Sequence, residues 1–202
     1  MNTLTRRTAI MGAVSALGGC SAIASLNEAT QALDTYELRP AAGSARGPRS
    51  ARTLLIPLPQ ASAVLSTDRI MVKPDAASVT YLPDARWGDA LPAVFQSLLI
   101  RSISDTGRIG YVGPAEGGPV PDRVILARID AFEVQAAEGA LLALVDINLT
   151  ILNDRDQRVV ASRRFDGAQE LAGDDPRTII AGFQTVLNTL LPAMADWAVQ
   201  RA

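Results

Sequence analysis

The sequence predicts an α/β protein of the α+β type, a single two-layer domain in which two long amphipathic helices pack on one face of a mixed or antiparallel sheet. Three observations predict this fold. In residues 141–152 every second side chain is apolar and Asp146, Asn148 and Thr150 fall on the other face, as in a strand with one packed and one solvated face. Two stretches, one after Asp89 and one after Asp175, carry apolar residues at helical spacing. Hydrophobic residues make up 48% and charged residues 20% of the 202 residues, which is a globular composition.

The N-terminus is typical of an export signal. Arg6 and Arg7 supply its positive charge, and residues 9–18 form an uncharged apolar run. This run is about half of the roughly 20 apolar residues that a membrane span needs. The arginine pair partly resembles a twin-arginine signal. Because Ala9 stands where Leu or an aromatic residue is usual, the export route stays open.

The apolar run ends in a pattern that resembles a bacterial lipobox, which consists of Leu17, Gly18, Gly19 and Cys20. We predict a signal peptide over residues 1–19 and lipid attachment at Cys20; the alternative is an ordinary signal that ends beside a buried cysteine. Residues 20–34 are then the lipidated cysteine and a tether, and residues 35–202 are the domain. The mature chain has 17 basic and 21 acidic residues, so acyl chains rather than charge would anchor it to a membrane.

Short strands begin the domain. Residues 35–39 are predicted to form a strand that ends before Pro40, and residues 41–50 form a loop rich in Gly, Ser and Pro. The apolar run of residues 53–58 is typical of a buried strand. Residues 69–73 and 78–82 are predicted to pair as a hairpin.

The first helix is predicted to begin at Asp89, an N-cap residue, with Pro92 in its first turn, and to end at Gly107. A strand over residues 109–112 and an exposed loop over residues 113–121 follow. The apolar stripe of this helix consists of Leu91, Phe95, Leu98, Leu99 and Ile103.

An antiparallel meander and a second helix complete the domain. The meander consists of residues 123–134, 141–152 and 158–165, and its first strand has Ile125, Ala127, Ile129 and Ala131 on one side. The second helix begins with Asp175 as N-cap and Pro176 as its first residue, and Pro192 is predicted to kink it. Its apolar stripe consists of Ile179, Phe183, Val186, Leu190, Met194 and Trp197.

Composition excludes several function classes. The chain has no histidine and one cysteine, which rules out a Ser-His-Asp triad, a Cys-His dyad, a histidine metal ligand and an internal disulfide. The net charge of −2 disfavours nucleic-acid binding. The single lysine, Lys73, is predicted to be solvated beside a turn. We therefore predict a protein that is not an enzyme and that holds no metal or cofactor.

Polar residues on the predicted sheet are the candidates for partner binding. Asp146, Asn148 and Thr150 share one face of their strand, and Arg163 and Arg164 follow on the next strand. Since the helices would cover the opposite face, this face is a candidate dock for a partner protein. The alternative is the ordinary solvent side of a sheet, with arginines and acids paired across strands.

Residues 84–89 combine Asp84, Arg86, Trp87 and Asp89 in a short segment. General acid–base catalysis needs two carboxylates held across a substrate, and these two are five residues apart with no partner motif. Capping by Asp89 and packing by Trp87 are therefore favoured over an active site.

Several segments, in this order, resemble the ABC-type transport auxiliary lipoprotein family, the PqiC-like proteins. The segments are residues 36–40 (YELRP), 54–57 (LLIP), 67–70 (TDRI), 79–82 (VTYL), 85–92 (ARWGDALP) and 131–133 (AFE). The resemblance extends from Tyr36 to about Trp197. It makes Tyr36, Arg69, Arg86 and Trp87 structural motif residues.

The resemblance implies a mixed sheet with helices and no catalytic activity. It also implies three partners: an inner-membrane permease, its ATPase and a substrate-binding protein with an MCE domain, which together move phospholipids or other hydrophobic molecules. The auxiliary lipoprotein would dock this system at the periplasmic side of the outer membrane. Ser21 after the lipidated cysteine favours that membrane, because Asp is the usual inner-membrane retention signal.

Two other classes stay open at this point. One is a lipoprotein cofactor of cell-wall synthesis or of another envelope complex. The other is a carboxylate-based envelope hydrolase that uses Asp84 or Asp89. Self-association into a homo-oligomer is open as well.

Overall fold

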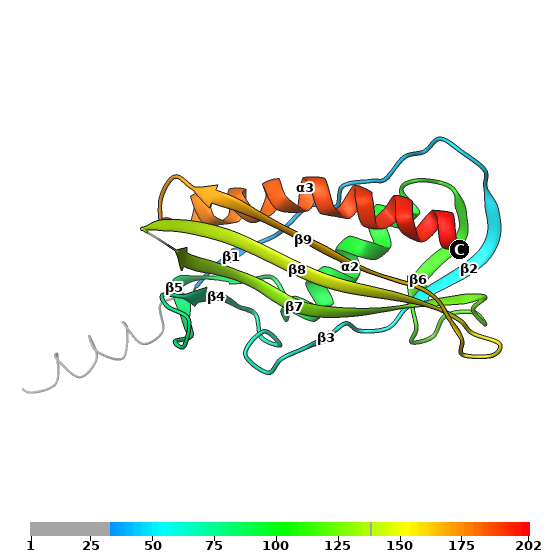
Figure 1. Ribbon diagram of the computed structural model, residues 1–202, viewed down its shortest axis with the longest axis horizontal. Helices are drawn as coiled ribbons and strands as arrows, with labels where there is room; N and C mark the ends of the chain where they lie inside the picture. Colours follow the sequence, from blue (N-terminus) through cyan, green and yellow to red (C-terminus); the bar gives the residue numbers. More distant parts are fainter. Residues whose placement is uncertain (1–32, 138) are drawn as a thin grey trace, which may run out of the picture. The chain divides into compact units, whose positions relative to one another are not determined.

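This computed structural model describes residues 33–137 and 139–202. In this part of the chain there are nine strands and two helices, joined by turns and loops (Figure 1). They belong to one unit, Asp34–Ala202. The predicted signal peptide, the lipidation site Cys20 and nearly all of the tether lie outside the described residues.

A long antiparallel meander is the main part of the sheet. It consists of β7 (Arg123–Ala137), β8 (Ala140–Asn153) and β9 (Val159–Leu171). The predicted meander is thus confirmed, although β9 continues six residues beyond the predicted end. The alternation in β8 is also confirmed, because Val145, Ile147 and Leu149 are fully buried while the residues between them are half-buried.

Shorter strands line the other edge of β7. Its first half pairs in parallel with β2 (Ser50–Ile56), which also pairs with β6 (Ile109–Pro114). The two-residue strand β3 (Gln60–Ala61) pairs with its middle. The second half of β7 pairs in parallel with β4 (Arg69–Lys73). The predicted hairpin joins β4 to β5 (Thr80–Trp87), and β1 (Asp34–Tyr36) adds in parallel to β5. The sheet is therefore mixed, as predicted.

Helices α2 (Leu91–Ser104) and α3 (Pro176–Arg201) form the second layer, behind the meander in Figure 1. Every residue of both predicted apolar stripes is buried. Asp175 caps α3 as predicted, since its side chain accepts a hydrogen bond from the Thr178 N–H at 3.1 Å. By length and composition α3 is able to cross a membrane, but half of its apolar window is buried and the helix packs on β8, β9 and α2. We interpret it as a core helix.

A bulge in β7 sets the centre of the core. Ile129 pairs with Ile147 and Ala131 with Asp146, so Asp130 is an extra residue without a partner on β8. From this point on, the even-numbered residues of β7 face the helices. Phe132 therefore stacks on Phe183 with ring centroids 4.8 Å apart. Ala131 was predicted on the same side of the strand as Ile125, Ala127 and Ile129, but after the bulge it pairs with Asp146 and lies on the other side.

Two predicted boundaries are corrected. The first strand ends at Tyr36 rather than at residue 39, because its partner β5 ends at Trp87, the residue paired with Tyr36. Asp89 does not cap α2: the N-cap is Ala90, which makes no side-chain cap hydrogen bond. Residues up to Trp87 belong to β5, and the Asp89 carboxylate accepts from the adjacent Ala90 N–H, at 2.6 Å, rather than from a later N–H of the helix.

Candidate interaction surfaces

The face of the sheet opposite the helices, here called the outer face, carries three of the predicted partner-binding residues. Asp146, Asn148 and Thr150 alternate along β8 with its buried residues and are half-buried. Asn148, the middle residue of the three, pairs with Arg128 of β7 and Arg164 of β9. β8 is the central strand of the meander, so these polar groups lie between two strands rather than at an open edge.

Paired charges cross the middle of the outer face. Arg164 donates from Nε and NH2 to the two carboxylate oxygens of Asp146, both at 2.8 Å. Arg128 donates to both oxygens of Asp130 at 2.7 and 3.0 Å, which holds the pKa of Asp130 below its ordinary value. Thr150 and Ser162 share a hydrogen bond of 2.9 Å. The cross-strand pairing considered for this face is thus present.

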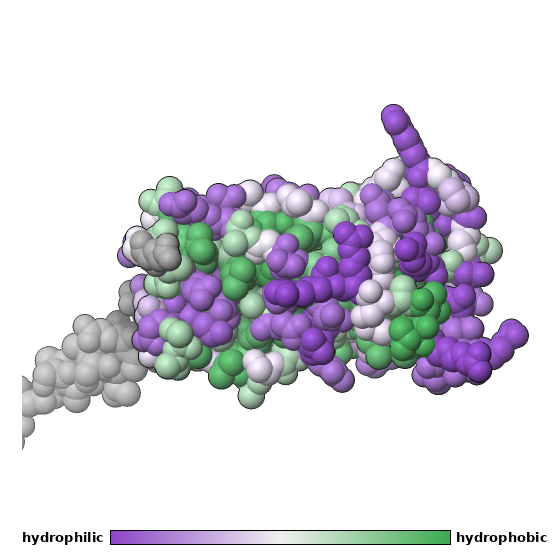
Figure 2. All heavy atoms as spheres, in the orientation of Figure 1, coloured by the Kyte–Doolittle hydropathy of each residue, from purple (hydrophilic) through white to green (hydrophobic). Residues whose placement is uncertain are grey.

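An apolar hollow adjoins this charged band. Its volume is about 310 Å³, and Asn148 and Thr150 line one side of it. Its apolar wall includes Leu58, Leu126 and Val159, which are 55%, 43% and 62% exposed. Figure 2 shows a hydrophilic band across the middle of this view and a hydrophobic patch to the right of it. The outer face therefore combines accessible apolar side chains with a charged band.

The fourth predicted residue, Arg163, does not belong to the outer face. It pairs with Leu149, whose side chain faces the helices, and its Cζ lies 4.8 Å from the ring centroid of Phe165 on that side. Arg164, rather than Arg163, lies beside Asp146 on the outer face. Because adjacent residues of a strand point to opposite faces, Arg163 and Arg164 cannot share one, and the buried neighbour Phe165 is the sequence signal for their orientation.

Lys73 forms an ion pair that sequence reasoning missed. Its Nζ lies 3.0 Å from Oε1 of Glu133, and the two side chains are 33% and 4% exposed. Oε2 of Glu133 is buried with no hydrogen-bond partner among the described residues. The Lys73 side chain is thus partly exposed, and the prediction of a solvated lysine omitted its ion pair. The position of Glu133 inside an apolar stretch was the available signal, since a buried carboxylate needs a partner.

The four motif residues come together around β5. Tyr36 pairs with Trp87, and Arg69 pairs with Arg86. Trp87 is 2% exposed. Arg69 donates to the Leu82 carbonyl at 3.0 Å, and Arg86 donates to Thr35 Oγ1 at 3.2 Å. These contacts join β1, β4 and β5, so the motif serves the fold.

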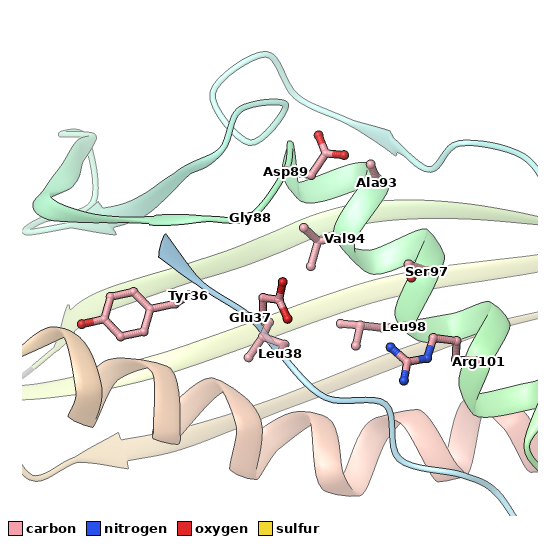
Figure 3. Close-up of a pocket in the computed structure, with 10 residues that line it drawn as sticks. All are labelled: Tyr36, Glu37, Leu38, Gly88, Asp89, Ala93, Val94, Ser97, Leu98 and Arg101. Atoms are coloured by element: carbon pink, nitrogen blue, oxygen red, sulfur yellow. The ribbon is translucent and has the colours of Figure 1, made fainter. Parts of the chain in front are cut away.

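A hollow of about 290 Å³ lies between α2 and the segment that follows β1 (Figure 3). Glu37 and Asp89 line it together with Arg101 of α2, and all three are exposed. Asp84, the other carboxylate of the hydrolase alternative, does not line it. Within residues 33–137 and 139–202, no group of three or more Asp, Glu or Cys side chains is arranged to hold a metal ion.

The comparison with family models identifies one family for this chain. The family model of the ABC-type transport auxiliary lipoprotein component matches residues 36–195. An uncharacterised protein of Bradyrhizobium diazoefficiens is 28% identical over 173 residues, which cover 82% of this chain and 44% of that protein. The chain therefore spans less than half the length of this relative.

Two solved structures share the fold. A protein from Xanthomonas campestris has a TM-score of 0.77 and 23% identity, over 83% of this chain and 95% of that one. An uncharacterised protein has a TM-score of 0.63 and 10% identity, over 85% and 99% of the two chains. At these identities the likeness concerns the fold alone.

Proposed function

Because the chain belongs to the ABC-type transport auxiliary lipoprotein component family, we propose that it is the lipid-anchored docking subunit of an MCE-type transport system. The system would move phospholipids or other hydrophobic molecules between the inner and outer membranes. The subunit would lie at the periplasmic side of the outer membrane, and its partners would be the MCE-domain protein, the permease and the ATPase. It would act without a catalytic site of its own.

The family match over residues 36–195 is the observation that carries this proposal, because it includes nearly all of the described unit. The lipobox-like residues before Cys20 and the following Ser21 support the anchor and its membrane. The absence of histidine supports a role without catalysis, and so does the position of Asp89 in a hollow that Asp84 does not line.

The outer face is the surface that we propose for docking the MCE-domain protein. The helices cover the opposite face, whereas the outer face leaves Leu58, Leu126 and Val159 accessible beside the charged band. Accessible apolar side chains within a polar rim are typical of protein interfaces. Asp146, Asn148 and Thr150 would supply the polar contacts.

Adjacent arginines give a matched test of the dock. Arg164→Glu and Arg163→Glu make the same charge change on neighbouring residues of β9, but only Arg164 lies on the outer face. We expect Arg164→Glu and Leu126→Asp to weaken capture of the MCE-domain protein by the immobilised lipoprotein at least tenfold, and Arg163→Glu to leave it unchanged. Equal capture by all three variants would contradict the docking surface.

Co-purification from membranes tests the transport role separately. Recovery of the permease, ATPase and MCE-domain protein with the tagged full chain supports it. Recovery of a cell-wall synthesis complex instead would overturn it. Hydrolysis of phospholipid or peptidoglycan that Asp89→Asn abolishes would overturn the claim that the subunit is not an enzyme.

A further inference from the structure

Three arginines converge on a hollow at the end of the meander where β7 begins and β8 ends. Arg52 of β2, Arg123 of β7 and Arg155 of the loop after β8 line this arginine hollow, whose volume is about 480 Å³. β1, where the described unit begins, instead joins the strands that pair with the second half of β7. The arginine hollow and the start of the unit therefore lie at opposite ends of β7 (Figure 1).

These arginines differ from those of the outer face in having no ionic partner in the part of the chain that the structure describes. Arg128 and Arg164 each form an ion pair, whereas none of Arg52, Arg123 and Arg155 lies within 4 Å of a carboxylate oxygen of residues 33–137 or 139–202. Arg123 donates from NH1 to the Asp122 carbonyl at 3.1 Å, and its Nε is buried with no partner among the same residues. A guanidinium group that is held by the preceding residue and has an unpaired donor among the described residues is suited to bind an anion.

The two carboxylates in the arginine hollow make hydrogen bonds to the protein itself. Asp122 accepts from the Thr53 N–H at 2.8 Å. Asp154 makes a contact of 3.4 Å with Gln157 Nε2. Three guanidinium groups thus face two carboxylates that are already hydrogen-bonded, which leaves a net positive hollow on a chain whose net charge is −2.

We propose that the arginine hollow binds a phosphate group, such as that of a phospholipid headgroup; the lipid assignment rests on the function proposed above. Arginine matches the geometry of phosphate oxygens because it donates two parallel hydrogen bonds. Val120 also lines the hollow and is 86% exposed, which places an apolar side chain beside the anion site. Leu152 lines the apolar hollow of the outer face and the next residue, Asn153, lines the arginine hollow. Because adjacent residues of a strand point to opposite faces, the apolar contact for the acyl chains comes from Val120 in the arginine hollow rather than from the apolar hollow.

Vesicle binding tests the proposal with a chain of residues 21–202, which lacks the anchor but keeps the whole described unit. Its cooperative melting is checked first. We expect it to float with phosphatidylglycerol vesicles at low salt, and each Arg→Gln change at Arg52, Arg123 or Arg155 to weaken binding about fivefold, as ~1 kcal/mol per basic side chain at an anionic surface implies. Arg177→Gln, in an exposed position of α3, is the control with the same charge change.

A titration with inorganic phosphate, followed by amide chemical shifts, distinguishes the source of the phosphate. Shifts confined to the arginine hollow without vesicle binding would support the anion site and assign it to a soluble phosphate compound. Binding to neither probe, or equal binding by the Arg52/Arg123/Arg155 triple variant and Arg177→Gln, would overturn the proposal. Capture of the MCE-domain protein is measured in parallel, so that failure of the anion site and failure of the docking role are separate results.

Discussion

Replacement of Trp87 tests whether the aromatic cluster holds the two layers together. Trp87 lies at the end of β5, and its ring meets Phe132 and Phe183 edge-on, with centroids 5.8 and 5.6 Å apart. Trp87→Ala would leave a cavity between β5, the bulged part of β7 and helix α3. Large-to-small changes of this kind cost about 3–5 kcal/mol, and each aromatic pair contributes roughly 0.5–1.5 kcal/mol beyond its buried area. We therefore expect a loss near the upper end of the range, about 4–5 kcal/mol.

Urea denaturation of the chain of residues 21–202, followed by circular dichroism, measures this loss. With a slope of about 2 kcal/mol per molar urea, the midpoint would fall by about 2 M. Trp87→Phe keeps a ring at the site and is expected to lose less than half as much. Tyr111→Ala removes an aromatic side chain that is 41% exposed and is expected to cost below about 1 kcal/mol. A loss of under 1 kcal/mol for Trp87→Ala, equal to that of Tyr111→Ala, would refute the reasoning.

The other predictions concern the anchor and two ion pairs. Cys20→Ser is expected to abolish acylation and membrane attachment, which labelled fatty acid and membrane fractionation would show; normal acylation would exclude Cys20 as the site. Lys73→Met leaves the Glu133 carboxylate buried without a cation and is expected to cost about 1–3 kcal/mol in urea denaturation. Lys73→Met/Glu133→Leu should recover most of this loss, and an additive double variant would show that the pair is not coupled. Arg128 lowers the pKa of Asp130 in the folded state. The stability that this ion pair adds to the folded protein is therefore fully present above the unfolded-state pKa of about 3.9, and it is lost as the pH falls through the folded-state pKa of Asp130. The difference in melting temperature between the native protein and Arg128→Gln should therefore be constant above about pH 5 and narrow in more acidic solution; a difference independent of pH would contradict the pairing.

Local patterns predicted the meander and both helices because their signals lie within single segments. The alternation in β8 is strict, and the Asp175–Pro176 start of α3 is a complete capping signal. The parallel pairing of β2 and β4 with β7 has no such signal, since it joins residues 60 or more positions apart. The bulge at Asp130 was missed for the same reason: an extra residue shows only against the register of the partner strand.

The interaction surfaces were predicted in part. The sequence placed Asp146, Asn148 and Thr150 together because one strand carries all three. It misplaced Arg163, because an error of one residue in strand phase moves a side chain to the opposite face. The arginine hollow draws on β2, β7 and the loop after β8, so only the assembled sheet reveals it.

The extra residue in β7 acts as a phase shift in the strand. If Asp130 were deleted, every later residue of β7 would turn over: Phe132 would face outward, and the charge of Glu133 would point at Phe183. The aromatic cluster and the Lys73–Glu133 pair thus depend on the same single insertion. We therefore expect a substitution of Asp130, which removes only its ion pair with Arg128, to destabilise the protein less than deletion of the residue.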